Sequence, residues 1–284
     1  MSLRIVIDSA SDITKEKADT LGLDYMPLKT IFGDEEYLDG VTLPHYAFYE
    51  KLIESGIFPT TSQIPPHEFE KKYKEIKEAG DTAIVITLSS LLSGTYQSAH
   101  LALEGYEDCV HLVDSKNVCI GEQNLVMYAV RLRDEGLSAE EIVKRLEEAK
   151  TKICVLSVFD TLEYLKRGGR ISSTAAWAGN VLSIKPVISV EKGEIAILGK
   201  ARGSKNGNNL LIQQIAAHGG IDFTMPYCLG YTGLEDSMLQ KYLKDSAAIW
   251  EGKVAAEAIP ISTVGSTIGT HAGPGAIAVS FFHP

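Results

Sequence analysis

Hydroxyl side chains are concentrated in one short segment, TLSSLLSGTYQSA at 87–99, directly after the apolar run 83–86. Seven of its thirteen residues have a hydroxyl group, namely Thr87, Ser89, Ser90, Ser93, Thr95, Tyr96 and Ser98. At the end of a strand and the start of a helix, such groups can cap the helix or help its free N–H groups bind an anion. A serine nucleophile at Ser93 is a further alternative, but Leu91 and Thr95 occupy the glycine positions of the hydrolase elbow G-x-S-x-G. The segment therefore favours a cap or an anion site over a hydrolase.

A second group of hydroxyls lies in TTSQIPP at 60–66, where Thr61, Ser62 and the Gln63 amide precede two prolines. Taken alone, this segment is typical of a loop that caps the following helix.

In DSASD at 8–12, Asp8 ends an apolar run. An aspartate-dependent phosphatase needs a second acid two residues later, and that position is Ala10. A turn or capping role is therefore favoured for Asp8.

Basic side chains lie beside glycines in two further segments. LEYLKRGGRIS at 162–172 places Arg170 after a glycine pair, and GKARGSKNGNN at 199–209 places Arg202 between a hairpin and a helix. A guanidinium group can donate two parallel hydrogen bonds to a carboxylate or a phosphate. Basic residues at a helix end or in a solvated loop need no ligand. Both interpretations stay open for Arg170, and a solvated loop is the default for Arg202.

His271 lies in GTHAGPGAIAVSFF at 269–282, among glycines that precede an apolar strand. This Gly-rich loop is a favourable place for a histidine to face a ligand. The glycines do not form G-x-G-x-x-G between a strand and a helix, so nucleotide binding is poorly supported. The other six histidines have no metal-ligand spacing, and we expect neither a metal site nor another cofactor.

Predicted strands and helices, which must position these residues, alternate along the first 150 residues. Apolar runs predict strands at 3–7, 24–31, 82–88 and 109–113. Periodic windows predict helices from Pro44, over 66–80 and 93–104, up to Gly136, and after a capping box of Ser138 with Glu141. This order predicts βαβ units, hence an N-terminal α/β domain over 1–150 with a mostly parallel, Rossmann-like sheet.

The pattern changes after Lys150. Strands at 187–190 and 195–198 flank a four-residue turn, which predicts a β-hairpin and antiparallel pairing. Further strands are expected at 153–158, 227–232, near 254–259 and at 276–282, with helices at 205–218 and 236–248. We therefore expect a C-terminal α/β domain over 151–284 with a mixed, partly antiparallel sheet.

Composition limits the functions that this chain of 284 residues can have. A formal net charge of −10 argues against a nucleic-acid surface and against broad attraction to anionic membranes. The four cysteines form no C-x-x-C pair, which favours buried thiols and a reducing cytoplasm. The sequence has no signal-peptide pattern and no apolar run long enough to span a membrane.

Five segments together resemble motifs of the DegV family of bacterial fatty-acid-binding proteins, in the family's order and over almost the entire chain. They are IDSASD at 7–12, TSQ at 61–63, SGTY at 93–96, LKRGGRI at 165–171 and HAGPGA at 271–276. The resemblance implies a two-domain α/β protein that holds one long-chain fatty acid, such as palmitate, between its domains. It implies a lipid-binding carrier without catalytic activity of its own.

The resemblance also implies roles for particular residues. In the family, the fatty-acid carboxylate is bound at the positions of Thr61 and Ser93, with Ser62, Gly94 and His271 in the same head-group region. Several members are the acyl-carrying subunit of a fatty acid kinase, in which a separate ATP-binding protein phosphorylates the bound carboxylate. Arg170 and Arg202 match positions linked to that partner or to the phosphate.

Two other hypotheses from different classes remain open at this stage. One is a serine-dependent lipid hydrolase or acyltransferase that uses Ser93 and His271. The other is a small-molecule sensor without a lipid ligand, for which a short and polar largest pocket would be evidence.

Overall fold

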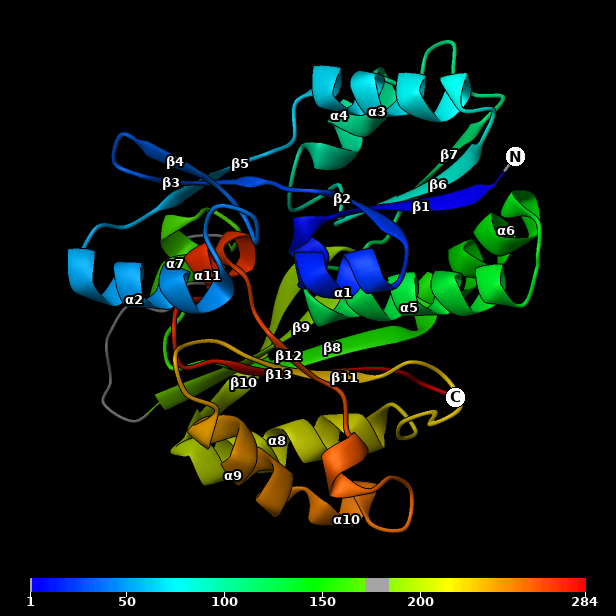
Figure 1. Ribbon diagram of the computed structural model, residues 1–284. Helices are drawn as coiled ribbons and strands as arrows, with labels where there is room; N and C mark the ends of the chain where they lie inside the picture. Colours follow the sequence, from blue (N-terminus) through cyan, green and yellow to red (C-terminus); the bar gives the residue numbers. More distant parts are fainter. Residues whose placement is uncertain (1, 172–183) are drawn as a thin grey trace.

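The computed structural model describes residues 2–171 and 184–284, which form three sheets with helices packed around them (Figure 1). The first sheet has four parallel strands in the order β2-β1-β6-β7. Their bounds are β1 Leu3–Asp8, β2 Leu23–Met26, β6 Thr82–Thr87 and β7 Val110–Asp114. This is the parallel N-terminal sheet that the βαβ pattern predicts.

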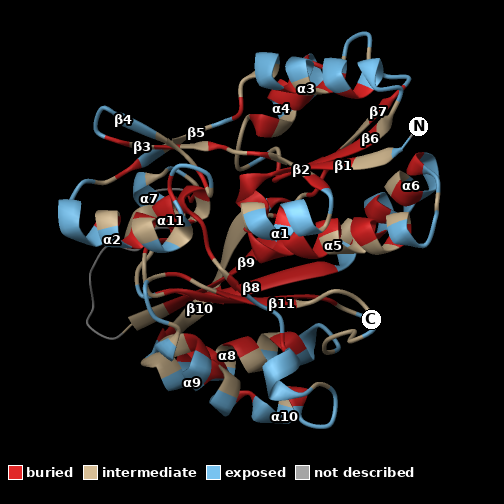
Figure 2. Cartoon of the chain, viewed as in Figure 1, coloured by how far each residue is buried: buried red, intermediate tan, exposed pale blue. Residues whose placement is uncertain are grey.

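Side chains of the first sheet alternate between two cores, because successive residues of a strand point to opposite faces. Along β1, Val6 packs with the helices α3 and α4, whereas Ile5 and Ile7 pack with α1, α5 and α6. The helix bounds are α1 Lys15–Thr20, α3 Pro66–Glu78, α4 Thr95–Leu101, α5 Ile120–Asp134 and α6 Ala139–Ala149. The central strands β1 and β6 are buried over most of their length, which explains their apolar runs, whereas the edge strands β2 and β7 are only partly buried (Figure 2).

The second sheet has six strands in the order β10-β9-β8-β13-β11-β12 and is mixed, with mostly antiparallel pairs. Their bounds are β8 Ile153–Val158, β9 Ile184–Glu191, β10 Glu194–Arg202, β11 Cys228–Tyr231, β12 Ile261–Thr263 and β13 Ile277–Phe282. One face packs on α5 and the other on α8 Ser204–Ala217, α9 Ser237–Asp245 and α10 Ala247–Trp250. Helix α5 therefore lies between the two large sheets (Figure 1).

These two sheets confirm the expected α/β class, with a parallel N-terminal sheet and a mixed C-terminal sheet. The hairpin expected at 187–198 is present as β9 and β10, and its turn has positive φ at Lys192 and Gly193. The capping box is also present, because Ser138 and Glu141 exchange both hydrogen bonds. The domain boundary near residue 150 stays a prediction.

A third, antiparallel sheet in the order β4-β3-β5 was not predicted. Its strands are β3 Lys29–Phe32, β4 Glu35–Leu38 and β5 Thr60–Ser62, and they lie beside α2 His45–Ser55, α7 Glu163–Arg167 and α11 Ser266–Ala272 (Figure 1). The segment 60–66, predicted to be a loop, therefore begins as a strand. The remaining elements are the 3₁₀ helices η1 Ser9–Ser11, η2 Lys150–Lys152 and η3 Ala256–Ala258.

Three other expectations about local structure were wrong. The strand predicted at 24–31 is two strands in different sheets, because Pro27 cannot donate a ladder hydrogen bond and the N–H of Leu28 instead donates to Ser9 Oγ at 3.0 Å. The strand predicted near 254–259 is the 3₁₀ helix η3, and β12 begins only after Pro260. The helix predicted at 236–248 is interrupted at Ser246, whose Oγ donates to the carbonyl of Tyr242 at 2.7 Å.

All four cysteines are buried and unbridged, which confirms their interpretation as small apolar side chains. Asp8 caps η1, as expected: its carboxylate accepts from the N–H of Ala10 at 2.9 Å and from that of Leu88 at 2.8 Å. Within residues 2–171 and 184–284, no helix has the length and apolarity needed to cross a membrane.

Candidate functional site

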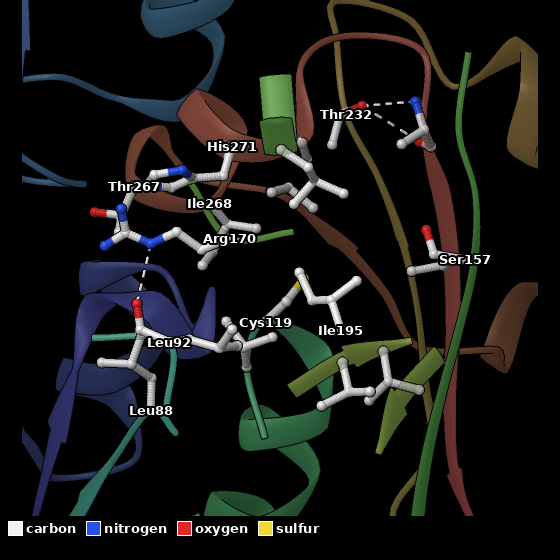
Figure 3. A pocket seen from close by; sticks show the side chains of 18 of the residues that line it. Leu88, Leu92, Cys119, Ser157, Arg170, Ile195, Thr232, Thr267, Ile268 and His271 are labelled. Atoms are coloured by element: carbon white, nitrogen blue, oxygen red, sulfur yellow. Dashed lines mark hydrogen bonds between the residues drawn. The ribbon is translucent and has the colours of Figure 1, made fainter. Parts of the chain in front are cut away.

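An interior cavity of about 350 Å³ lies between the carboxyl end of the first sheet and one face of the second. The loop after β6 contributes Leu88, Leu92 and Ser93, and β5 contributes Thr61. The opposite wall is the sheet face that bears Ser157 and Ile195 (Figure 3). This volume is at the lower end of the range of about 300–1,000 Å³ that is usual for small-molecule sites.

The wall from the second sheet is a row of cross-strand neighbours. Gly230 of β11 pairs with Ala278 of β13, which pairs with Ser157 of β8, which pairs with Ile188 of β9. All four line the cavity. Three small side chains at the centre of the sheet leave open space there, and the Ser157 hydroxyl is satisfied because it donates to the carbonyl of Ile277 at 2.6 Å. This wall therefore offers an apolar surface to a ligand.

Polar groups gather at one end of the cavity, where His271 and Thr61 form a hydrogen-bonded pair. His271 Nε2 and Thr61 Oγ1 are 2.8 Å apart, although the two residues are 210 positions apart in sequence. His271 Nδ1 is buried and has no hydrogen-bond partner among the described residues. Burial, with a contribution from the charge of Arg170, lowers the pKa of His271 to about 4. The imidazole is therefore neutral at pH 7, so one of its nitrogens can donate one hydrogen bond and the other can accept one.

Ser93 and Gly94 form the second part of the polar end. Ser93 Oγ lies 3.0 Å from Thr95 Oγ1 and accepts from the N–H of Thr95 at 3.2 Å. Gly94 precedes α4 and also lines the cavity. A Cβ at Gly94 would lie 1.9 Å from Oε1 of Gln63, so only glycine allows that side chain to cross the start of α4.

Arg170 extends into the same region from the segment after α7. Its Nε donates to the carbonyl of Leu92 at 3.0 Å, and its Nη1 donates to that of Gly168 at 2.7 Å. Figure 3 shows Arg170 beside His271, both away from Ser157 and Thr232. Burial lowers the pKa of Arg170 from its usual value, but a guanidinium group remains charged at neutral pH. The polar end therefore combines one positive charge with hydroxyls and a neutral imidazole.

The structure brings six of the seven predicted site residues together around one cavity: Thr61, Ser62, Ser93, Gly94, Arg170 and His271. Arg202 lies elsewhere, exposed at the end of β10, and does not line the cavity. The expectation that His271 lies in a Gly-rich loop was wrong, because it belongs to the last turn of α11 and the glycine loop begins after it.

The cavity wall of the second sheet was not predicted. Gly230, Ala278 and Ser157 are ordinary small residues within apolar strands, and their alternation is the only signal of a shared face. Their juxtaposition depends on the register of three strands that are far apart in sequence. The same holds for Thr267 and Ile268, which point into the cavity from α11.

The fold and the cavity define an α/β protein with a largely apolar interior site that has a polar end. The chain belongs to the DegV family, whose model matches residues 2–283. A DegV domain-containing protein from Caldanaerobacter subterraneus subsp. tengcongensis is 36% identical over 280 residues, which cover 98% of each chain.

Two solved structures are also similar to this chain. A DegV family protein from Thermus thermophilus, described for its fatty acid binding, is 29% identical, with a TM-score of 0.88 and complete coverage of both chains. A stearic acid-binding protein from Eubacterium ventriosum is 26% identical, with a TM-score of 0.85, and the match covers 99% of this chain and 97% of that one. Structural relatives of this chain are thus fatty-acid-binding proteins.

Proposed function

We propose that this protein binds one long-chain fatty acid, such as palmitate, between its two domains. The carboxylate is held by Thr61 and Ser93, with Ser62, Gly94 and His271 in the same head-group site. The observation that supports this most is the apolar cavity with these hydroxyls, the imidazole and the Arg170 guanidinium at one end. Burying a carboxylate among such donors avoids the large cost of an unpaired buried charge.

The acyl chain supplies most of the affinity in this proposal. Burial of apolar groups contributes about 0.8 kcal/mol per CH₂, so roughly 14 methylenes offer on the order of 11 kcal/mol before association and ordering costs. Two or three hydrogen bonds at the head contribute less than this. The polar end therefore fixes the orientation of the ligand and the preference for an acid over an ester, while the apolar wall provides affinity.

We further propose that the protein is a non-catalytic carrier in the cytoplasm that presents its fatty acid to a separate ATP-dependent kinase subunit. Arg170, at the polar end, would act on the head group or its phosphate, and the exposed Arg202 would contact the partner. A hydrolase has less support, because Ser93 Oγ contacts Thr95 and His271 Nε2 contacts Thr61. Buried free cysteines are consistent with a reducing compartment.

Native mass spectrometry of the purified protein, followed by lipid extraction, tests the proposed ligand. We expect one fatty acid per chain, released intact on denaturation, and displacement of a fluorescent fatty acid by palmitate. An empty protein that displaces no probe would contradict the proposal. Labelling of Ser93 by a fluorophosphonate, with an acyl-enzyme mass shift, would favour the hydrolase instead.

A further inference from the structure

Helix α11 is a short element that presents several groups to the cavity. Within its seven residues, Ser266–Ala272, it contributes Thr267, Ile268 and His271 to the cavity lining. A helix of this length does not hold its position by itself, because its few internal hydrogen bonds do not offset the ordering cost. Neighbouring elements must therefore determine where α11 begins and how His271 meets Thr61.

The carboxylate of Asp39 holds the first residue of α11. Asp39 Oδ1 accepts from the backbone N–H of Ser266 at 2.8 Å and from the Ser266 hydroxyl at 2.7 Å. Both residues are fully buried. Asp12 holds the preceding residue, since its Oδ1 accepts from the N–H of Gly265 at 2.7 Å. Two carboxylates from the N-terminal half thus satisfy the N–H groups at the start of a helix from the C-terminal half.

A second contact fastens the same serine to the small antiparallel sheet. Thr30 Oγ1 and Ser266 Oγ are 2.8 Å apart. Because Ser266 donates its only hydroxyl hydrogen to Asp39, Thr30 must donate to Ser266. Thr30 lies directly opposite Thr61 in the pairing of β3 with β5, so both threonines point to the same face of that sheet.

These contacts form a closed circuit around α11. Thr30 contacts Ser266 at the start of the helix, and its cross-strand partner Thr61 contacts His271 at 2.8 Å in the last turn. Close packing limits sliding, because a Cβ at Gly265 would lie 2.8 Å from His45 Nε2, and one at Gly269 would lie 2.5 Å from Phe48 Cε1. The position of the helix start therefore determines the position of the imidazole.

We propose that Asp39 is a positioning residue: its carboxylate fixes where α11 begins and thereby places His271 against Thr61 in the proposed head-group site. The effect on ligand affinity rests on the proposed function, whereas the effect on His271 geometry does not. Asp39 Oδ1 makes the contacts, and Oδ2 has no hydrogen-bond partner within the described part of the chain. An asparagine that keeps Oδ1 can therefore replace the carboxylate, and an alanine cannot.

The experiment compares Asp39→Ala, Asp39→Asn and Thr30→Val with the wild type. In the ligand-free protein, the ¹⁵N and ¹H signals of the His271 imidazole report its contact with Thr61. We expect these signals to change in Asp39→Ala and Thr30→Val and to stay at their wild-type values in Asp39→Asn. Displacement of a fluorescent fatty acid by palmitate should give a Kd raised roughly tenfold in Asp39→Ala and roughly threefold in Thr30→Val.

Ser246→Ala is the matched control. Ser246 is also buried, and this variant removes the hydrogen bonds of its hydroxyl, to the carbonyls of Tyr242 and Leu243 and from Trp250 Nε1. It lies on the other side of the second sheet from the cavity. We expect a lower melting temperature with unchanged His271 signals and unchanged Kd. General destabilisation is thereby separated from positioning.

The proposal would be overturned if the His271 signals of Asp39→Ala stayed at their wild-type values. It would also be overturned if Ser246→Ala changed those signals as Asp39→Ala does. If Asp39→Ala does not fold, Thr30→Val tests the proposal instead. Wild-type His271 imidazole signals in Thr30→Val would then overturn the proposal. If the wild type binds no palmitate, the proposed ligand is wrong, and the imidazole signals of the ligand-free variants still decide the role of Asp39.

Discussion

The two large sheets contribute to the cavity in different ways: the first provides the ends of its strands, and the second provides a face. After β6, the chain turns at 88–94 and presents backbone groups, hydroxyls and the start of α4. In the second sheet, the row that includes Gly230, Ala278 and Ser157 presents small side chains from the middle of three strands.

This difference follows from the geometry of strands. The carboxyl ends of parallel strands meet at one edge of a sheet, where the chain leaves the ladder and its polar groups are free to bind. The middle of a strand has all of its backbone groups paired, so only side chains can face a ligand. An amphiphilic ligand needs both kinds of surface. Here the second sheet supplies the apolar one, and the loop after β6, together with Thr61 of β5 and His271 of α11, supplies the polar one. Each prediction below alters the apolar wall, the polar end or, for Arg202, an exposed position outside both.

The largest expected effect comes from filling the apolar face. Ala278→Phe places a ring in the centre of the sheet row that lines the cavity. We expect the Kd for palmitate to rise more than a hundredfold. The Kd for decanoate should rise less, because its shorter chain occupies less of the cavity. Fluorescence displacement measures both. Ala256→Phe, on the exposed η3 away from the cavity, should leave both affinities unchanged. Equal losses for the two acids would argue against a wall that contacts the acyl chain.

Removing hydroxyls from the polar end should have the next largest effect. Thr61→Val and Ser93→Ala each remove one proposed donor to the carboxylate, and each should weaken palmitate binding roughly tenfold, since hydrogen bonds to charged groups contribute about 1.5–3 kcal/mol. The double variant should bind palmitate roughly a hundredfold more weakly, or weaker still. Thr61→Ser keeps the hydroxyl and should stay close to the wild type. Full affinity in the double variant would remove both residues from the site.

The largely buried imidazole at the polar end should give the protein a pH-dependent stability. The pKa of His271 is lowered to about 4 in the folded protein, against about 6.5 in the unfolded chain. Its contribution is therefore fully present above pH 6.5 and is lost as the pH falls toward 4. The maximum is roughly 3 kcal/mol, from about 1.4 kcal/mol per unit of pKa shift.

Urea denaturation of wild type and His271→Gln between pH 4 and pH 7.5 measures this contribution. Burial raises the pKa of Asp8 to about 7, which has the opposite sign, because that contribution is present at low pH and is lost as the pH rises through 7. The difference between wild type and His271→Gln cancels the effect of Asp8. A difference that does not change with pH would show that His271 is not buried as a neutral group.

The smallest effect is expected at Arg202. It is exposed and outside the cavity, so Arg202→Ala should change the Kd for palmitate less than twofold.

Arg170→Ala should weaken palmitate binding several-fold, since this guanidinium lies at the polar end and its Nε also donates to the carbonyl of Leu92. With a cognate kinase subunit, both variants should reduce acyl-phosphate formation. Unchanged turnover in Arg202→Ala would remove this residue from the partner surface.

Much of the local structure followed from the sequence, because it depends on neighbouring residues. Continuous apolar runs marked the strands that are buried on both faces, and the turn at 191–194 marked the hairpin. Ser138 with Glu141 marked a helix start. Where the interpretation failed, a tertiary contact competed with a local pattern. The segment 24–31 looks like one strand, but Pro27 and the contact of Leu28 with Ser9 direct its second half into another sheet.

By itself, the sequence determined which residue types are available at the site: hydroxyls in 60–62 and 87–98, a guanidinium at Arg170 and an imidazole at His271. Only the tertiary structure decided which of them meet. Thr61 and His271 come together because β5 pairs with β3 and α11 packs on that pair. Arg202 stays outside because it lies exposed at the last position of β10, whereas Ile195, near the start of the same strand, lines the cavity. The physical reason is that strand register and helix docking are set by contacts across hundreds of residues, and no local pattern encodes them.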